Sequence, residues 1–500
     1  MQGGWLRLGV RGVLAALALL IVTAVRPALA ADRAPDLELK GEITAADRET
    51  YRRATFDLPA GVRRLTVVFS YTGKAERTVI DIGLWDGARF RGWSGGARDR
   101  LTLSVEDATP GYLPGPLPAG RWTLMLGVPN IRVGNQARFE ARVFFDRTSD
   151  PSDITVTALT DKPGWYRGDL HMHTAHSDAT CAGQDGVRAP CPVFRTVEAA
   201  AARGLDFIAI TDHNTISQFD AERELQPAFP HLLLIPGREI TTFKGHANLF
   251  GPNAFIDFRL GDRAVPDMEA LEAATAASGG LFSVNHPLLP SGENCMGCGW
   301  TATDTDWRGV QAIEVVNGGA LAYSDAGDGV FSGLPFWQAK LNAGYRITGV
   351  GGSDNHDAGL DARKASAVGR PTTVVYAQGL STPAILAGIR AGRVFIDIDG
   401  TRDRMLDLSA TLATTKAEMG DSVTAPLGVS VHFAARLEKL PGGTLELVED
   451  GHPVVLAPDG TFVWTSDGAR HWFRPGARDA KARLVLIGNP IYLNFGSSPP

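Results

Sequence analysis

The segment GDLHMHTAHSD, residues 168–178, is the most informative part of this 500-residue chain for predicting its central region. It contains three of the chain's eleven histidines and two aspartates. If residues 167–173 form a strand, side chains two apart share a face, so His171 and His173 point the same way, with Asp169 on that side. Two imidazoles at this spacing can bind one metal ion, but a His-x-His pair also fits a solvated polar loop. Other parts of the chain distinguish these two interpretations.

Five further segments place polar side chains at or just past the end of a predicted strand. Helix-like runs alternate with these strands, and one of them, residues 196–204, is expected to have Thr196 as N-cap and to end at Gly204. Such alternation predicts parallel strands joined by crossover helices, as in a barrel-type α/β domain. Active sites of such barrels lie where the carboxyl ends of the strands meet, so we expect the polar groups to converge there. These groups are Asp212 and His213 in AITDHN, Glu239 in IPGREIT, His246 and Asn248 in KGHANLFG, His286 in SVNHP, and Asp354 and His356 in GGSDNHD.

The distribution of histidine favours metal binding over a solvated loop. Eight of the eleven histidines lie between residues 171 and 356, and six of these are the His171–His173 pair and the four histidines just named. Bringing so many imidazoles and carboxylates together without cations would carry a large desolvation cost. Mixed imidazole and carboxylate groups suit Zn²⁺, Mn²⁺ or Fe²⁺, and the ligand types do not discriminate among these ions.

Regions rich in predicted strands flank this central part. Short alternating or apolar runs, such as TVIDIGLWDG and ARFEARVFFD, are separated by Gly, Pro and Asn turns before residue 150, and no histidine occurs there. After residue 400 the strand pattern returns, for example in GVSVHFAARL. We predict an α/β fold class with an N-terminal β-sandwich-like domain over 31–155, the barrel over 156–397 and a C-terminal β domain over 398–500.

Residues 1–30 have the features of a secretory signal peptide. Arg7 and Arg11 give a positive start, residues 13–25 form an apolar run too short to span a membrane, and Ala28-Leu29-Ala30 matches a cleavage site. An uncleaved N-terminal anchor is the alternative interpretation. We expect cleavage near Ala30, a periplasmic or secreted protein, and no membrane span after cleavage.

The composition and the absence of other motifs exclude several classes of protein. A hydrophobic content of 44% and a charged content of 21% are ordinary for a globular chain and exclude extensive disorder. The net charge of −6 argues against a nucleic-acid partner. The chain has no P-loop and no Rossmann glycine fingerprint, so these nucleotide sites are not expected.

The four cysteines are Cys181, Cys191, Cys295 and Cys298. In an oxidising compartment disulfides are expected, and four cysteines allow three pairings among which the sequence does not choose. The Cys295-x-x-Cys298 pair is interpreted as closing a loop, with a redox pair or half of a zinc site as alternatives. Because the cysteines lie in the predicted mouth loops 179–195 and 288–308, we hypothesise that disulfides shape the mouth.

The ordered set DLHMHTAHSD, ITDHN, GREIT, GHANLFG, NHP and GSDNH resembles the PHP (polymerase and histidinol phosphatase) superfamily. The chain resembles the carbaryl-hydrolase-like (CehA/McbA-type) metallohydrolases more closely. This resemblance extends outside the barrel, to FRGWSGGARDRLTLSVEDATPGYLPGPLPAGRW in the N-terminal region and to NPIYL near the end. The resemblance implies a distorted (β/α)7 barrel with two or three divalent metal ions.

The resemblance also assigns ligands to each ion. Position 178 is aspartate here, whereas many relatives have histidine, and His176 is a competing ligand two residues away. His176 and Lys244 are the candidate catalytic side chains, with Lys244 expected to neutralise an anionic substrate. Asp169 and Asp212 are expected either to orient imidazoles or to bond strand ends. The expected ligands are His171, His173, Glu239 and Asp354 for the first ion, Glu239, His246 and His286 for the second, and Asp178, His213 and His356 for the third.

Two neighbouring metal ions can generate a hydroxide from water at neutral pH and polarise a phosphoryl or carbonyl oxygen. The superfamily resemblance implies hydrolysis of phosphoesters, and the closer resemblance implies carbamate esters or amides as substrates of the same site. A non-catalytic binding protein on this scaffold is the alternative from another functional class. The expected partner is a small-molecule substrate, and the sequence does not predict the oligomeric state.

Overall fold

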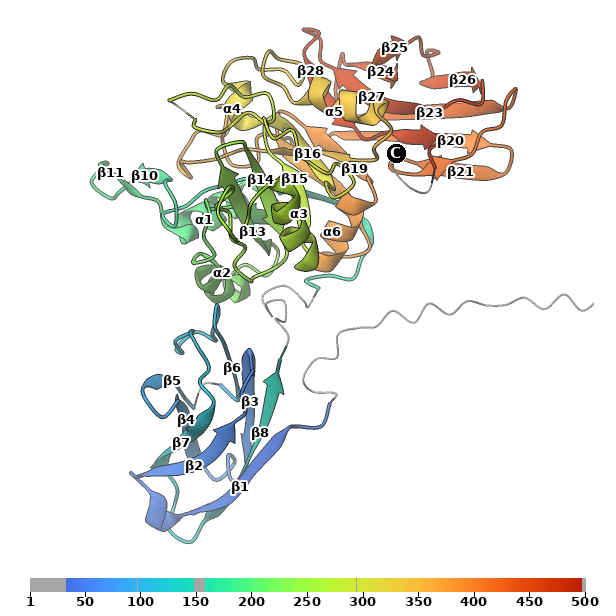
Figure 1. Cartoon of the computed structure of the whole chain (residues 1–500). Coiled ribbons are helices and arrows are strands. Elements are labelled where there is room, and N and C mark those ends of the chain that lie inside the picture. The colour runs from blue at the N-terminus through green and yellow to red at the C-terminus, as the bar shows by residue number, and fades with distance from the viewer. Residues whose placement is uncertain (1–32, 97, 148–157, 294, 497–500) are drawn as a thin grey trace, which may run out of the picture.

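The computed structural model describes residues 33–96, 98–147, 158–293 and 295–496. The predicted signal peptide and the boundary predicted at 155/156 lie outside the described residues. Figure 1 shows an N-terminal pair of sheets, a central region of mixed strands and helices, and further sheets toward the C-terminus. Within the described ranges no helix is long and apolar enough to span a membrane.

The N-terminal region forms two four-stranded sheets that share one core. Its strands are β1 (Leu37–Thr44), β2 (Tyr51–Leu58), β3 (Arg64–Tyr71), β4 (Val79–Trp85), β5 (Phe90–Gly95), β6 (Arg100–Ser104), β7 (Gly120–Asn130) and β8 (Gln136–Asp146), with a 3-10 turn at Ala45–Asp47. The sheet orders are β1-β8-β3-β6 and β2-β7-β4-β5. Alternation buries Ala141 and Val143 of one sheet against Trp122 and Leu124 of the other. The β structure predicted for this region is confirmed.

The central strands form one sheet that carries the predicted metal ligands. Its members are β9 (Gly164–Asp169), β12 (Phe207–Ile210), β13 (Leu233–Thr242), β14 (Gly245–Phe250), β15 (Leu281–Val284), β16 (Ala312–Asn317), β17 (Thr348–Gly352), β18 (Thr372–Ala377) and β19 (Val394–Asp397). They pair in the order β17-β16-β15-β14-β13-β12-β9-β18-β19. A separate hairpin of β10 (Thr180–Ala182) and β11 (Arg188–Pro190) follows β9 in the chain.

The strand directions correct the prediction of an all-parallel sheet. Strands β9, β12 and β13 are parallel neighbours, as are β15, β16 and β17. In contrast, β14 is antiparallel to both of its neighbours because a two-residue turn, Phe243-Lys244, joins it to β13 and leaves no room for a crossover helix. Strands β18 and β19 are also antiparallel to their neighbours. Among the described residues β17 pairs only with β16, so the closed (β/α)7 barrel stays a prediction.

The helices cover the central sheet and differ in one boundary from the prediction. They are α1 (Val193–Arg203), α2 (Phe219–Leu225), α3 (Met268–Ala277), α4 (Gly318–Leu321), α5 (Leu334–Asn342) and α6 (Thr382–Arg390), with a 3-10 turn at Gln226–Ala228. Helix α1 ends at Gly204 as predicted, where a φ of 69° suits glycine. It begins three residues before Thr196, because Val193 and Val197 form one buried helical face. Thr196 is therefore a buried helical residue and not the N-cap.

The C-terminal strands extend the central sheet. They are β20 (Met405–Leu412), β21 (Thr415–Glu418), β22 (Ser422–Val423), β23 (Ser430–Glu438), β24 (Thr444–Glu449), β25 (His452–Val454), β26 (Thr461–Thr465), β27 (His471–Arg478), β28 (Leu484–Gly488) and β29 (Ile491–Leu493). Strand β28 pairs with β19, so the C-terminal region shares a sheet with the central one. A second sheet, β21-β20-β23-β26, packs on this extension through a common core in which the Phe433 and Phe473 rings lie 4.4 Å apart.

Candidate metal centre

Glu239 is the central carboxylate of the candidate site. It lies on β13 and is 1% exposed. Its Oε2 lies 3.5 Å from His171 Nε2 and 3.7 Å from His173 Nε2. Its Oε1 lies 3.3 Å from His246 Nδ1 and 3.4 Å from His286 Nε2. Its Oε2 also lies 2.8 Å from His213 Nδ1, so one oxygen of this buried carboxylate faces three imidazoles and the other faces two.

The first pair of imidazoles is completed by Asp354. His171 and His173 follow the end of β9, which stops at Asp169 instead of continuing to residue 173 as predicted. The Oδ1 atom of Asp354, just past β17, lies 3.4 Å from His171 Nε2 and 3.1 Å from His173 Nε2. Together with Glu239 Oε2, these atoms bring together the four residues expected for the first ion.

The second pair comes from neighbouring strands. His246 lies on β14 and His286 follows β15 by two residues. Both side chains are almost completely buried, and both rings turn one nitrogen toward Glu239 Oε1. The three residues expected for the second ion therefore lie together, with Glu239 shared between the two groups.

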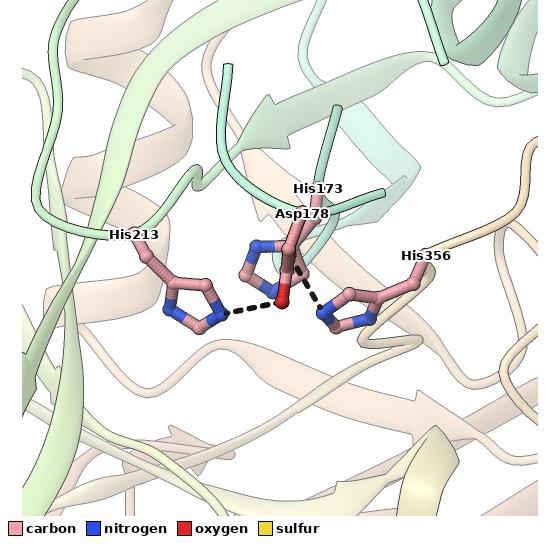
Figure 2. Close-up of side chains that lie close together, drawn as sticks. All are labelled: His173, Asp178, His213 and His356. Atoms are coloured by element: carbon pink, nitrogen blue, oxygen red, sulfur yellow. Dashed lines mark ion pairs between the residues drawn. The ribbon is translucent and has the colours of Figure 1, made fainter. Parts of the chain in front are cut away.

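A third group lies nearer the surface, around Asp178. Figure 2 shows the Asp178 carboxylate between the imidazoles of His213 and His356. Asp178 Oδ2 lies 3.8 Å from His213 Nε2, and its Oδ1 lies 3.3 Å from His356 Nε2. The His173 ring stacks on both imidazoles, with ring centroids 4.4 and 4.1 Å away. Because the Asp178 side chain is 58% exposed, this group opens to solvent, unlike the two around Glu239.

The two candidate catalytic side chains lie at the rim of the centre. His176 is exposed, and its Nδ1 lies 2.7 Å from Ser217 Oγ. The structure thus places Asp178, and not His176, beside His213 and His356. Lys244 is exposed in the turn between β13 and β14, and its carbonyl accepts a hydrogen bond from the backbone N–H of Thr301. Catalytic roles for His176 and Lys244 stay predictions.

The residues of the centre fit divalent cations. His171 Nε2 is buried, has no hydrogen-bond partner within the described residues, and lies 3.5 Å from Glu239 Oε2 and 3.4 Å from Asp354 Oδ1. Such an atom costs about 1–3 kcal/mol if nothing pairs with it. Two ligand atoms bound at 2.0–2.1 Å to a tetrahedral ion stand about 3.4 Å apart. Four of the five imidazole separations from the Glu239 oxygens, 3.3 to 3.7 Å, match this spacing, whereas the fifth, 2.8 Å to His213 Nδ1, is the distance of a hydrogen bond.

The electrostatic environment shifts the pKa values of the candidate ligands in both directions. Burial and the positive charges of His356 and His213 lower the pKa of His173 to about 4. Burial alone would raise the pKa of Glu239, but His171 and His213 bring it well below its ordinary value. His173 is therefore neutral and Glu239 is anionic near neutral pH, as required of imidazole and carboxylate ligands. Burial lowers the pKa of His171, but Asp354, Glu314 and Glu239 raise it well above its ordinary value, so a metal ion bound there would displace a proton.

Glu314 on β16 is a buried residue of the centre that the sequence analysis did not identify. Its Oε1 lies 3.0 Å from His171 Nδ1. Its Oε2 accepts hydrogen bonds from the backbone N–H of His286 and from Asn317 Nδ2, both at 3.0 Å. A carboxylate on the far ring nitrogen fixes the tautomer that leaves His171 Nε2 open for a metal ion. The only sequence signal is a single glutamate in the otherwise apolar run AIEVV.

Asp169 and Asp212 accept hydrogen bonds from the backbone at strand ends. Of the two roles expected for them, this is the structural one and not the orientation of imidazoles. Asp169 accepts hydrogen bonds from the backbone N–H groups of Ser353 at 2.9 Å and Gly369 at 2.7 Å. Asp212 accepts from Thr174 through its backbone N–H at 2.7 Å and its hydroxyl at 2.6 Å. These bonds connect the segments that carry the ligands, and neither aspartate orients an imidazole directly.

Three residues of the centre or next to it have strained backbone conformations. Asn214, His286 and Asp354 have φ values of 53°, 26° and 52°. Positive φ is uncommon for residues other than glycine and costs free energy that the surrounding structure must offset. His286 and Asp354 are both expected ligands, and Asn214 follows the ligand His213. Strain of this kind clusters at functional sites.

A cavity of about 600 Å³ adjoins the centre. Two of its lining residues contact ligands: Thr241 Oγ1 lies 2.7 Å from His213 Nδ1, and the Met296 carbonyl lies 3.1 Å from His246 Nε2. The cavity is of a size that small-molecule sites commonly have. Its apolar wall is formed by Phe243, Phe258, Leu260 and Met296.

The four cysteines form two disulfides, Cys181–Cys191 and Cys295–Cys298. This is one of the three pairings that the sequence left open. The first disulfide joins β10 to the residue after β11, three positions beyond Asp178. The second closes a loop whose carbonyl groups contact His246 and His286. Both therefore lie in the segments that border the centre.

Removal of metal is expected to lower the thermal stability of the chain. A ligand present at 100 times its Kd stabilises the folded state by about 2.7 kcal/mol, which corresponds to roughly 3 °C in Tm if a chain of this length unfolds as one unit. Differential scanning calorimetry with a chelator and after Mn²⁺ addition measures this shift. An unchanged Tm would contradict a structurally coupled metal centre.

No protein-family model matches the chain. No curated protein matches it either. A search of solved structures finds a "putative metal-dependent phosphoesterase" from Bifidobacterium adolescentis that is 16% identical, with a TM-score of 0.28. The match covers 44% of this chain and 94% of that protein.

Proposed function

We propose that this chain is a metal-dependent hydrolase of phosphoesters that acts outside the cytoplasm. The observation that carries the proposal is the arrangement around Glu239, where buried imidazole nitrogens lie near its two oxygens at the spacing of a coordination sphere. Divalent ions bound there would supply an activated water and polarise the substrate oxygen. The signal-like N-terminus and the two disulfides support the location, because disulfides persist in oxidising compartments.

The chain's own residues would hold the ions and orient the substrate. Glu239 and Asp354 supply anionic oxygens toward the first group, and Glu314 keeps His171 in the ligand tautomer. The cavity beside His213 and His246 would bind a small-molecule substrate next to the ions. Lys244 in the adjoining turn would neutralise an anionic oxygen of the substrate.

A parallel assay tests the reaction class. The purified chain is depleted of metal, reloaded with Mn²⁺ or Zn²⁺, and offered bis-p-nitrophenyl phosphate and 1-naphthyl methylcarbamate. We expect release of p-nitrophenol that a chelator abolishes and that metal addition restores. Hydrolysis of neither compound, together with less than one metal ion bound per chain, would favour a non-catalytic binding protein instead.

Hydrolysis of carbamate esters is the second candidate, and the lining of the cavity favours it. Phe243, Phe258 and Leu260 form an apolar wall, and the Arg259 guanidinium is already paired with Asp257 at 2.6 Å. An uncharged ester would leave less charge unpaired there than a phosphoester. Hydrolysis of 1-naphthyl methylcarbamate alone in the parallel assay would select this second candidate.

A further inference from the structure

A single four-residue loop contacts both histidines of the second group. The loop is Cys295-Met296-Gly297-Cys298. The Met296 carbonyl lies 3.1 Å from His246 Nε2, and the Cys298 carbonyl lies 3.2 Å from His286 Nδ1. Carbonyl oxygens only accept hydrogen bonds, so each of these ring nitrogens donates a proton.

These two hydrogen bonds determine which nitrogen of each ring is open to a metal ion. With the proton on Nε2, His246 presents Nδ1, which lies 3.3 Å from Glu239 Oε1. With the proton on Nδ1, His286 presents Nε2, which lies 3.4 Å from the same oxygen. The loop therefore fixes opposite tautomers in the two histidines, and both open nitrogens face Glu239.

The loop is held in place by the disulfide and by its close contact with the β13–β14 turn. The Cys295–Cys298 disulfide closes the four residues into a ring. At Gly297, where φ is 80°, a Cβ atom would collide with the Thr242 carbonyl, so the backbone packs directly on the end of β13. The Met296 carbonyl belongs to this ring and the Cys298 carbonyl is attached directly to it, so opening the ring loosens both contacts at once.

We propose that the Cys295–Cys298 disulfide is a redox-controlled positioning element for the metal site of Glu239, His246 and His286. A dithiol reductant would cleave the Sγ–Sγ bond: two electrons pass from the dithiol, which becomes a cyclic disulfide, and each cysteine Sγ takes one proton. The opened loop would then hold the two carbonyls less firmly and weaken binding of one metal ion. The proposal rests on the metal centre proposed above, but not on the reaction it catalyses.

If the Cys298 sulfur were itself a metal ligand, reduction of the disulfide would strengthen metal binding instead of weakening it. The Cys298 sulfur lies within 4.8 Å of ring nitrogens of His246 and His286, close enough for the three to share an ion. A thiolate released by reduction would be a strong ligand for Zn²⁺ but a poor one for Mn²⁺. Comparing the two ions therefore separates positioning by the loop from ligation by the sulfur.

Metal titrations of the oxidised and the reduced chain test the proposal. The whole chain is reduced with dithiothreitol, freed of reductant without oxygen, and titrated with Mn²⁺ while electron paramagnetic resonance measures the free ion. Thiol titration before and after reduction establishes the state of the cysteines. A Cys295→Ser/Cys298→Ser variant removes the loop disulfide permanently, and Cys181→Ser/Cys191→Ser is the matched control without the other disulfide. A parallel titration with Zn²⁺ tests for thiolate ligation.

We expect reduction and the Cys295→Ser/Cys298→Ser change to weaken binding of one Mn²⁺ about 10-fold, as loss of partners that orient ligands does elsewhere. The control variant should bind like the oxidised chain. Equal Mn²⁺ affinities before and after reduction would overturn the proposal and leave the metal centre intact. Tighter Zn²⁺ binding after reduction would also overturn it and would assign Cys298 as a ligand. Absence of Mn²⁺ binding in every sample would overturn the centre as well. If the serine variant does not fold, the reduced wild-type chain decides.

Discussion

Replacing Glu239 with glutamine is expected to remove at least one bound metal ion per chain and to lower hydrolysis more than about 100-fold, beyond the loss typical of residues that merely orient ligands. The physical reason is that its two oxygens face different imidazoles. Glutamine retains one oxygen, and its NH₂ group cannot bind a cation, so one group loses its ligand in either orientation. Both groups also lose the negative charge that they share.

Metal content by elemental analysis and the rate of p-nitrophenol release measure this effect. Glu272→Gln is the matched control, because Glu272 is also a buried glutamate but lies on α3, where it accepts a hydrogen bond from the Asp306 backbone. The control should keep its metal content. A Glu239→Gln chain with the metal content and rate of the unchanged protein would refute the central role of this carboxylate.

The fold was predictable where local patterns decide it. The alternation of apolar and polar residues before residue 150 predicted the strands of the N-terminal sheets, and Gly204 predicted the end of α1. The direction of β14 was not predictable from its apolar pattern, because a buried strand has the same pattern in either direction. The decisive feature was the length of the turn at Phe243-Lys244. The join between β19 and β28 depends on pairing between residues far apart in the chain, which no local pattern reveals.

The candidate site was predictable to the extent that its residues stand in short motifs. All nine expected ligands lie in the three groups that the resemblance implied. Glu314 was not predictable in this way, because it reaches His171 across 143 positions of sequence and stands in no polar motif. The same contact explains Gly352, where a Cβ atom would collide with the His171 side chain and with Glu314 Oε1. The need for glycine at position 352 is therefore evident only from the packing of β16, β17 and β9.

Replacing Glu314 with glutamine is expected to weaken metal binding 10- to 100-fold without changing the fold, roughly the loss that follows removal of a residue orienting a ligand. Glu314 Oε1 faces the proton on His171 Nδ1, and Oε2 accepts from two donors, the His286 backbone and Asn317 Nδ2. Every neighbour of this carboxylate is thus a donor. The glutamine NH₂ group must face one of them in either orientation, which breaks a buried hydrogen bond and releases either the His171 ring or the loop of His286.

Mn²⁺ titration and the metal dependence of the hydrolysis rate distinguish this effect from the loss of a ligand. Because all nine ligands remain in Glu314→Gln, excess Mn²⁺ should restore most of its activity, whereas Glu239→Gln should stay inactive at any metal concentration. Glu222→Gln is the matched control, since Glu222 is fully buried on α2 but contacts none of the expected ligands through a hydrogen bond or ion pair among the described residues. If Glu314→Gln bound Mn²⁺ as tightly as the unchanged chain, the carboxylate would have no part in positioning His171, and the tautomer of that imidazole would have to be fixed by the metal ion alone.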